Sequence, residues 1–263
     1  MNTVISKDGT TIAYDKLGSG QPIILIDGAL CYRSFGPMAK LAPLLAKHFT
    51  VYWYDRRGRG DSTDKKPYSV EREVEDLEAL INNAGGSVYV AGLSSGAALG
   101  LRAVKSGLNI SKLVMYEPPY VLGKKSNQTP PDHVGQLNAL IASNRRSAAV
   151  KYFMVDMVGA PAIAAFIMRL LPMWKKFTTI AHTLPYDAAI MGDWSVPTEI
   201  VSAVTIPTLI AGGEKSPATL RNAVQLISES LPNGTLRVLE GQSHNVNTEI
   251  LASMLTEFFT NHH

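Results

Sequence analysis

The hydrophobic pattern of this chain alternates between short continuous apolar runs and longer segments with helical spacing. A hairpin is predicted first, because an Asp8-Gly9 turn separates two β-prone runs within residues 3–14. Strand-like runs then recur at 23–26, 51–54, 88–91 and 112–116. Continuous apolar runs of this length are typical of strands that are covered on both faces.

Helical spacing of apolar residues fills the intervals between these runs, at 38–47, 70–83 and 97–105. A regular succession of strand and helix predicts an α/β fold with a mostly parallel central sheet and helices on both faces. The same rhythm returns near the C-terminus, with strands predicted at 208–211 and 236–239 and helices at 218–230 and 249–259.

Between residues 120 and 197 the rhythm stops, and the sequence becomes helix-like, rich in methionine and interrupted by prolines. We interpret residues 120–197 as a helical cap inserted into an α/β core of residues 1–119 and 198–263. The most apolar stretch of the cap, 160–171, is shorter than the roughly 20 residues of a membrane span and contains Pro161 and Arg169. We expect it to be a buried or substrate-facing helix.

Composition narrows the classes of function. Of the 263 residues, 25 are basic and 22 acidic, which gives a formal charge of +3 without a long run of one sign and little support for nucleic-acid binding. The single cysteine, Cys31, cannot form an intramolecular disulfide. The first 14 residues include Lys7 and Asp8 and lack the apolar centre of a secretory signal, so we expect a cytoplasmic protein.

The strongest chemical signal is Gly92-Leu93-Ser94-Ser95-Gly96, a G-x-S-x-G placed between a predicted strand and a predicted helix. In that context the serine sits on a strained turn where neighbouring β-carbons would collide, and its hydroxyl is pushed out as a nucleophile. The N–H of Ser95, at the start of the helix, is then a candidate oxyanion donor. The alternative is a small-residue junction that only packs tightly.

A serine nucleophile needs a base, and His244 is placed for that role, just after the last predicted strand. The other histidines fall at a helix end, in the predicted cap or at the C-terminus. Two carboxylates could orient the imidazole, because Glu117 follows the strand at 112–116 and Glu214 follows the strand at 208–211. These observations alone leave both candidates open.

The loop after the strand at 23–26 reads Asp27-Gly28-Ala29-Leu30. In this arrangement the second oxyanion donor is expected at Gly28 or Ala29, because glycine permits a close approach of the backbone. The candidate substrate contacts are apolar residues of this loop and of the cap: Leu30, Met154, Met157, Phe166 and Trp174. For each cap residue the alternative is a place in the cap's own core.

Together these motifs resemble the α/β-hydrolase superfamily across nearly the whole chain. The loop at 55–62, Asp-Arg-Arg-Gly-Arg-Gly-Asp-Ser, is similar to a structural turn of that superfamily, and we expect its charges to pair within the loop. Two departures matter, because members commonly carry His at position 27 and Asp at position 216, where this chain has Asp27 and Ser216. A subset similar to zearalenone lactone hydrolase instead places a glutamate where Glu117 stands, and this resemblance favours Glu117 over Glu214.

The resemblance implies a cofactor-independent serine hydrolase, a carboxylesterase or lactonase, that cleaves an ester, lactone or similar carbonyl compound with an apolar moiety through an acyl-serine. Other functions compatible with it are a non-catalytic binding protein, or perhydrolysis, carbon–carbon cleavage or cofactor-free oxygenation on the same scaffold. The expected partner is a small-molecule substrate, with no metal or other cofactor and no membrane span. A homodimer is left open.

Overall fold

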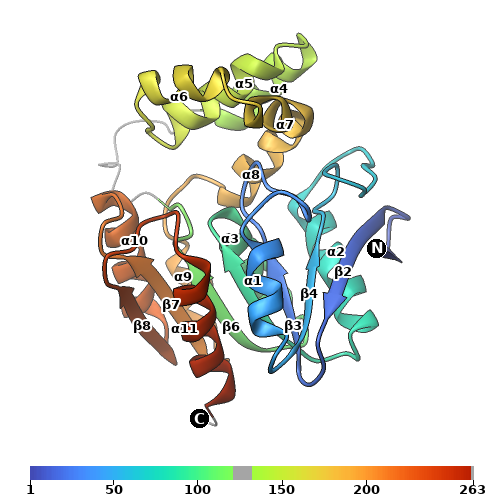
Figure 1. Ribbon diagram of the computed structural model, residues 1–263, viewed down its shortest axis with the longest axis vertical. Coiled ribbons are helices and arrows are strands. Elements are labelled where there is room, and N and C mark those ends of the chain that lie inside the picture. The colour runs from blue at the N-terminus through green and yellow to red at the C-terminus, as the bar shows by residue number, and fades with distance from the viewer. Residues whose placement is uncertain (121–131, 262–263) are drawn as a thin grey trace.

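The predicted strands form an eight-stranded sheet in the order β1-β2-β4-β3-β5-β6-β7-β8 (Figure 1). The computed structural model describes residues 1–120 and 132–261. The strands are β1 (Asn2–Ile5), β2 (Thr11–Leu17), β3 (Pro22–Ile26), β4 (Thr50–Tyr54), β5 (Val88–Leu93), β6 (Ile110–Tyr116), β7 (Thr208–Gly213) and β8 (Gly234–Leu239). β2 pairs antiparallel with both β1 and β4, and the remaining strand pairings of the sheet are parallel. The predicted α/β-hydrolase fold is confirmed.

Helices cover both faces of the sheet. One face carries α1 (Met38–Leu45) and α11 (Thr248–Thr260), and the other carries α2 (Val70–Asn83), α3 (Ser95–Lys105) and α10 (Ala218–Ser230) (Figure 1). Side chains of β3 alternate between these layers, since Ile24 and Ile26 join the cluster of α2 and α3 while Ile23 and Leu25 join that of α1 and α11. Both faces of β3 are therefore buried, which explains its unbroken apolar sequence.

A second layer of helices lies above the core in Figure 1. It contains α4 (His133–Ala142), α5 (Arg146–Tyr152), a π-helical turn at Phe153–Met157, α6 (Ala162–Arg169) and α7 (Met173–Ile180). A 3₁₀ turn at Ala181–Thr183 leads to α8 (Leu184–Met191), and α9 (Thr198–Ser202) follows. Residues 121–131 of the predicted cap lie outside the described residues.

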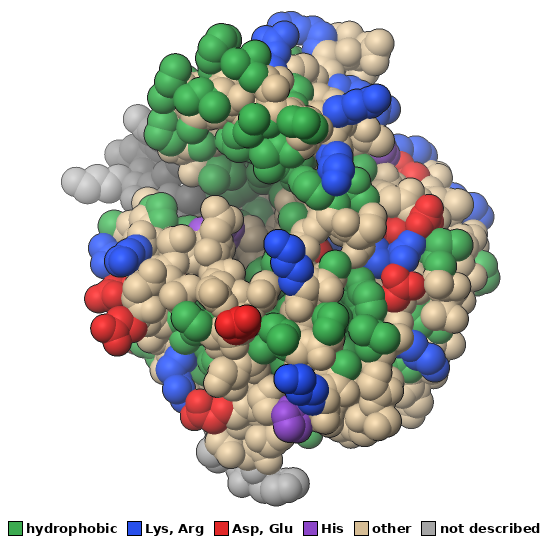
Figure 2. Space-filling model, in the orientation of Figure 1, with side chains coloured by type: hydrophobic (Ala, Val, Ile, Leu, Met, Phe, Trp, Pro, Cys, Tyr) green, Lys and Arg blue, Asp and Glu red, His purple; other side chains and the backbone are tan. Residues whose placement is uncertain are grey.

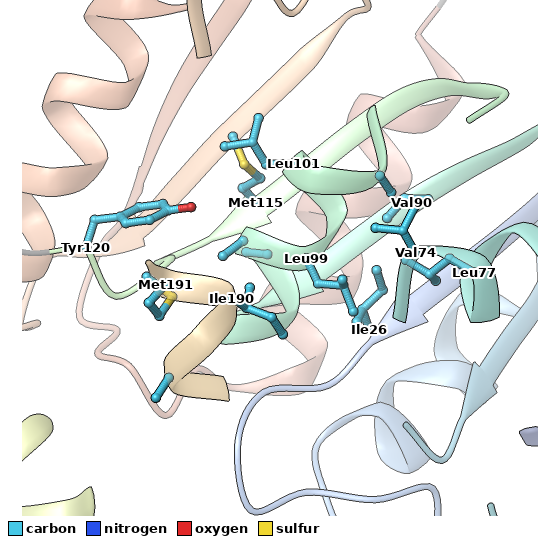
Figure 3. Packing of buried hydrophobic residues seen from close by; sticks show 14 of the residues in the cluster. Ile26, Val74, Leu77, Val90, Leu99, Leu101, Met115, Tyr120, Ile190 and Met191 are labelled. Atoms are coloured by element: carbon cyan, nitrogen blue, oxygen red, sulfur yellow. The ribbon is translucent and has the colours of Figure 1, made fainter. Parts of the chain in front are cut away.

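Helix α8 lies at the end of the predicted insertion but packs directly on the core. It contacts α2 and α3, and Figure 3 shows Ile190 and Met191 beside Leu99 of α3. Ile190 and Leu99 are completely buried, and Met191 is nearly so. Burial of each such side chain contributes about 1.5–3 kcal/mol to stability, so α8 is firmly packed on the core beneath the other helices of the predicted cap.

Residues 160–171 were expected to form a buried or substrate-facing helix, and helix α6 is not buried; that it faces a substrate stays a prediction. Ile163, Phe166 and Leu170 are 66%, 59% and 73% exposed, and within this helix Ala165 is buried. The reason is its position at the outer edge of the cap, where α7 and the preceding π-helical turn are its main neighbours. Figure 2 shows hydrophobic side chains gathered on this part of the surface. In the described parts of the chain no helix is long and apolar enough to cross a membrane.

Candidate active site

Parallel strands place the ends of β5 and β6 at one edge of the sheet. Leu93 pairs with Tyr116, so the next residues, Ser94 and Glu117, leave the sheet side by side. The Ser94 N–H donates to the Tyr116 carbonyl at 2.9 Å, and the Glu117 N–H donates to the Ala211 carbonyl at 3.0 Å. The backbone of both predicted site residues is thus held by neighbouring strands.

Ser94 occupies the strained turn that the glycine pattern predicts. Its φ and ψ are 55° and −126°, a conformation that non-glycine residues rarely adopt. A β-carbon on Gly92 would lie 2.4 Å from the Gly96 carbonyl oxygen, and one on Gly96 would lie 2.4 Å from the Ile26 carbonyl oxygen. Both positions therefore require glycine, and the turn leaves Ser94 partly accessible to solvent.

His244 lies against Glu117, with 2.8 Å between its Nδ1 and Glu117 Oε2. The carboxylate is completely buried, and its Oε1 accepts the N–H of Gly213 at 2.7 Å. The loop that carries the imidazole is also tied down, because the Tyr116 hydroxyl donates to the Ser243 carbonyl at 2.7 Å. The side chain of His244 is 39% exposed, so its ring extends from this buried support toward solvent.

Glu117 is ionised at neutral pH. Burial alone raises its pKa, but favourable polar interactions, of which the hydrogen bond from His244 is the largest, outweigh that effect, and the pKa lies below its usual value. Because an ionised carboxylate only accepts hydrogen bonds, the proton of the 2.8 Å contact belongs to His244 Nδ1. This arrangement leaves Nε2 as the ring nitrogen that is not engaged by Glu117.

Glu214, the alternative carboxylate, has a different environment. It is exposed, and its Oε2 accepts the N–H of Gly241 at 2.9 Å. Of the two glutamates that the sequence proposed, Glu117 is the one in contact with His244.

The loop predicted to supply an oxyanion donor lies beside the serine. A β-carbon on Gly28 would be 3.0 Å from Ser94 Cβ and 3.5 Å from Ser94 Oγ, so any larger residue would require its neighbours to shift. The backbone N–H groups of Ala29 and Ser95 have no hydrogen-bond acceptor among the described residues. Both are therefore available to a ligand. Leu30 is buried and has a φ of 59°, which marks the sharp exit of the loop.

The arginines of the loop at 55–62 do not pair within it, which corrects the expectation from the sequence. Arg56 binds Glu73 at 2.7 and 2.9 Å, and Arg57 binds Asp76 at 2.7 and 2.8 Å. Both carboxylates belong to α2, where helical spacing places them on the buried side. Buried guanidinium groups need close anionic partners, and the short loop cannot supply enough of them.

The third arginine of this loop reaches much farther along the chain. Arg59 binds Asp187 of α8 at 2.7 Å, and Arg56 binds the same carboxylate at 2.8 Å. The hydroxyl of Ser95 donates to Asp187 at 2.7 Å. Asp187 was not among the site residues predicted from the sequence. A usable signal was present, because this acid follows a stretch from 157 to 186 that contains no acidic residue.

The predicted apolar contacts of the cap lie in different environments. Met154 and Met157 are half-buried in the π-helical turn, whereas Phe166 is largely exposed on α6. Trp174 is buried inside the cap, where its Nε1–H donates to the Ser147 hydroxyl at 3.0 Å. Figure 2 shows a hollow between the cap and the core with hydrophobic side chains along its upper margin. Which residues touch a substrate stays a prediction.

The fold and these motifs define an α/β hydrolase. The profile of the Alpha/beta hydrolase family matches residues 18–251, and the chain belongs to that family. Along almost its whole length it is similar to a solved alpha/beta hydrolase from Sphaerobacter thermophilus DSM 20745, with 48% identity and a TM-score of 0.92. That similarity covers 98% of this chain and 100% of the other.

Two functionally described relatives are more distant. A non-heme haloperoxidase from Rhodococcus erythropolis is 23% identical over 262 residues, which cover 94% of each protein. The 2-hydroxy-6-oxo-6-(2'-aminophenyl)hexa-2,4-dienoic acid hydrolase from Metapseudomonas resinovorans is 34% identical over 103 residues. That match spans 37% of this chain and only 35% of the relative. Family membership supports hydrolase activity, and these names differ too much to define a substrate.

Proposed function

We propose that this protein is a serine hydrolase that cleaves a carboxylic ester or lactone, with Ser94 as nucleophile, His244 as base and Glu117 as the carboxylate that orients the base. The observation that carries the proposal is the 2.8 Å contact between His244 Nδ1 and the buried Glu117 carboxylate. Such a contact leaves Nε2 as the proton acceptor, which a serine nucleophile requires.

The proposed reaction has two halves. Ser94 Oγ forms a bond to the substrate carbonyl carbon while His244 Nε2 takes the hydroxyl proton, and the carbonyl π electrons move onto oxygen. Collapse of this intermediate expels the alcohol, which receives the proton from His244. Water then attacks the acyl-serine with the same base, and the acid and free Ser94 are released. The N–H groups of Ser95 and Ala29 are the proposed donors to both oxyanions.

An apolar moiety in the substrate is proposed from the methionines at the cap. Met154 and Met157 are half-buried, and flexible thioether side chains adapt to apolar ligands of different shapes. Such a lining favours an apolar moiety over a sugar or a phosphate, and the resemblance to the lactone-hydrolase subset, which rests on the position of Glu117, favours a lactone or an ester.

A fluorophosphonate probe tests the proposal directly, since it labels an activated serine whatever the natural substrate is. We expect labelling at Ser94 in the wild type and none in Ser94→Ala, with much slower labelling in His244→Ala. A panel of p-nitrophenyl esters and lactones of increasing chain length then measures kcat/KM and the preference for apolar acyl groups. Absence of labelling in the folded wild type would favour a non-catalytic binding protein.

Perhydrolysis is the second candidate, and the similarity to a haloperoxidase over 94% of both chains favours it among the alternatives. It would use the same residues, with hydrogen peroxide replacing water in the attack on the acyl-serine to give a peracid. Assays with an ester in the presence and absence of peroxide measure the partition between acid and peracid.

A further inference from the structure

Asp187, a carboxylate outside the proposed triad, occupies the centre of a buried cluster behind the nucleophile. It is 2% exposed. Its Oδ1 accepts from Ser95 Oγ at 2.7 Å and from Arg56 Nη1 at 2.8 Å, and its Oδ2 accepts from Arg59 Nη2 at 2.7 Å. Burial alone raises its pKa, but the charges of Arg59 and Arg56 outweigh that effect, so the pKa lies below its usual value and the carboxylate is ionised.

The far side of Arg59 faces the oxyanion loop. Its Nη1 donates to the Gly28 carbonyl at 2.7 Å and to the Cys31 carbonyl at 3.2 Å. A peptide unit is planar and trans, so the Ala29 N–H must point opposite to the Gly28 carbonyl. By holding that carbonyl, Arg59 fixes the direction of the Ala29 N–H.

The other arm of the cluster reaches the second donor. Ser95 is the first residue of α3, and its side chain is directed away from the site by the bond to Asp187. This bond anchors the residue whose N–H is the other proposed oxyanion donor. One carboxylate is therefore linked through Ser95 to one donor and through Arg59 to the other.

The helix that carries Asp187 connects this cluster to the predicted cap. Asp187 lies on α8, which Ile190 and Met191 seat on α3 (Figure 3). The helices α4 to α7 precede α8 in the chain, and α4 packs against it. A displacement of α8 would move the Asp187 carboxylate relative to both donors.

We infer that Asp187 is a positioning residue that orders both halves of the oxyanion hole, through Arg59 and the Gly28 carbonyl on one side and through the Ser95 hydroxyl on the other. This inference rests on the proposed function. Charge balance alone does not explain this arrangement. A carboxylate that only neutralised a guanidinium would not need to bind both Ser95 and Arg59, which hold the two donors.

A matched control exists in the neighbouring ion pair. Asp76 binds Arg57 at 2.7 and 2.8 Å and is equally buried, but among the described residues neither makes a hydrogen bond to the loop at 27–31. Asp187→Asn removes one buried charge from Arg56 and Arg59, and Asp76→Asn removes one from Arg57 of the same loop. Both should lose stability, and only Asp187→Asn should lose oxyanion binding.

The experiment measures kcat, KM and the affinity for phenylboronic acid, whose tetrahedral adduct with a serine mimics the oxyanion. For Asp187→Asn we expect kcat to fall about 100-fold and boronate affinity to fall in parallel, while KM changes less than about threefold. For Asp76→Asn we expect kcat and boronate affinity within about threefold of wild type. Ser95→Ala keeps the backbone N–H but removes the bond to Asp187, and its kcat should fall about tenfold. This variant tests the same link if Asp187→Asn does not fold.

Hydrogen exchange of the peptide covering residues 27–33 provides a readout that needs no catalysis. Faster exchange there in Asp187→Asn, but not in Asp76→Asn, supports the inference. Equal exchange and equal loss of kcat in the two variants would overturn it. Lack of fluorophosphonate labelling in the wild type would refute the proposed function, while the exchange comparison would still decide whether Asp187 orders the loop.

Discussion

Replacement of Glu117 by glutamine should invert the tautomer of His244. The Glu117 Oε1 atom accepts the Gly213 N–H at 2.7 Å, so the amide oxygen of a glutamine must occupy that side. Its NH₂ group then faces His244 Nδ1, where the carboxylate Oε2 lies at 2.8 Å in the wild type. An amide donor there forces Nδ1 to accept and moves the ring proton to Nε2, which can no longer take a proton from Ser94.

The magnitude follows from this loss of the base. In serine hydrolases that use an aspartate in this role, the corresponding amide lowers kcat by about 10⁴, equivalent to about 5.5 kcal/mol at the transition state. We expect a fall of about 10³ to 10⁴ in kcat/KM for Glu117→Gln, with a smaller change in KM. Glu214→Gln is the control, because its carboxylate bonds the Gly241 N–H instead of the imidazole, and its kcat/KM should stay within about threefold.

The assays are ester hydrolysis, the rate of fluorophosphonate labelling at Ser94, and ¹⁵N NMR of the His244 ring, which distinguishes the two tautomers. Fold stability must be compared at each pH. The folded-state pKa of Glu117 is below its usual value, so its stabilising contribution is present above pH 4.5 and lost as pH falls through that lower pKa. Nearly wild-type activity in Glu117→Gln with strong loss in Glu214→Gln would refute the reasoning.

Three further predictions concern stability. Gly96→Ala should lower the free energy of unfolding by about 1–3 kcal/mol in urea titrations, because its methyl group would meet the Ile26 and Asp27 carbonyl oxygens at 2.4 and 2.7 Å. Burial raises the pKa of Asp27 from 3.8 to about 7, so the unfolded chain releases this proton at a lower pH than the folded protein. The free energy of unfolding of the wild type should therefore decline by on the order of 4 kcal/mol as pH rises from 4 to 8, and Asp27→Asn should lack this decline. Asp76→Asn should lower the free energy of unfolding by about 3 kcal/mol in the same titrations. The buried guanidinium of Arg57 would then keep Asp8, at 3.1 Å, as its one charged partner among the described residues. A loss below about 1 kcal/mol would contradict this reasoning.

The helices and strands of the core could be predicted from local sequence pattern, because the spacing of apolar residues in each element indicates which face is buried. The helix predicted at 70–83 and that at 218–230 have the observed bounds, and the hairpin turn at Asp8-Gly9 joins β1 to β2. The strand at 88–91 extends in the structure to Leu93, because the glycine at 92 pairs in the sheet while also making room for α3. Such differences at element ends reflect packing partners that periodicity does not contain.

The cap was less predictable for the same reason. An apolar run such as 160–171 indicates burial only when another element covers it, and the helix formed there has few neighbours. Within the candidate site, Ser94, His244 and Glu117 could be named because each follows a strand of a parallel sheet, and parallel strands end at one edge. The contact that distinguishes Glu117 from Glu214 depends on the path of the loop at 240–247, which no spacing rule specifies.

Asp187 illustrates a long-range contact that local sequence patterns do not predict. The cluster at Ser95 joins residues 56 and 59 to residue 187, over 131 and 128 positions, and no local pattern relates them. A physical constraint relates these residues. A buried guanidinium requires an anion, and the loop at 55–62 has more arginines than buried carboxylates. The excess must be met from elsewhere in the chain, and an acid that ends a long acid-free stretch is a natural candidate. An excess of arginines in a short loop is therefore a signal for long-range contact, and here it points to Asp187, which we infer orders both proposed oxyanion donors.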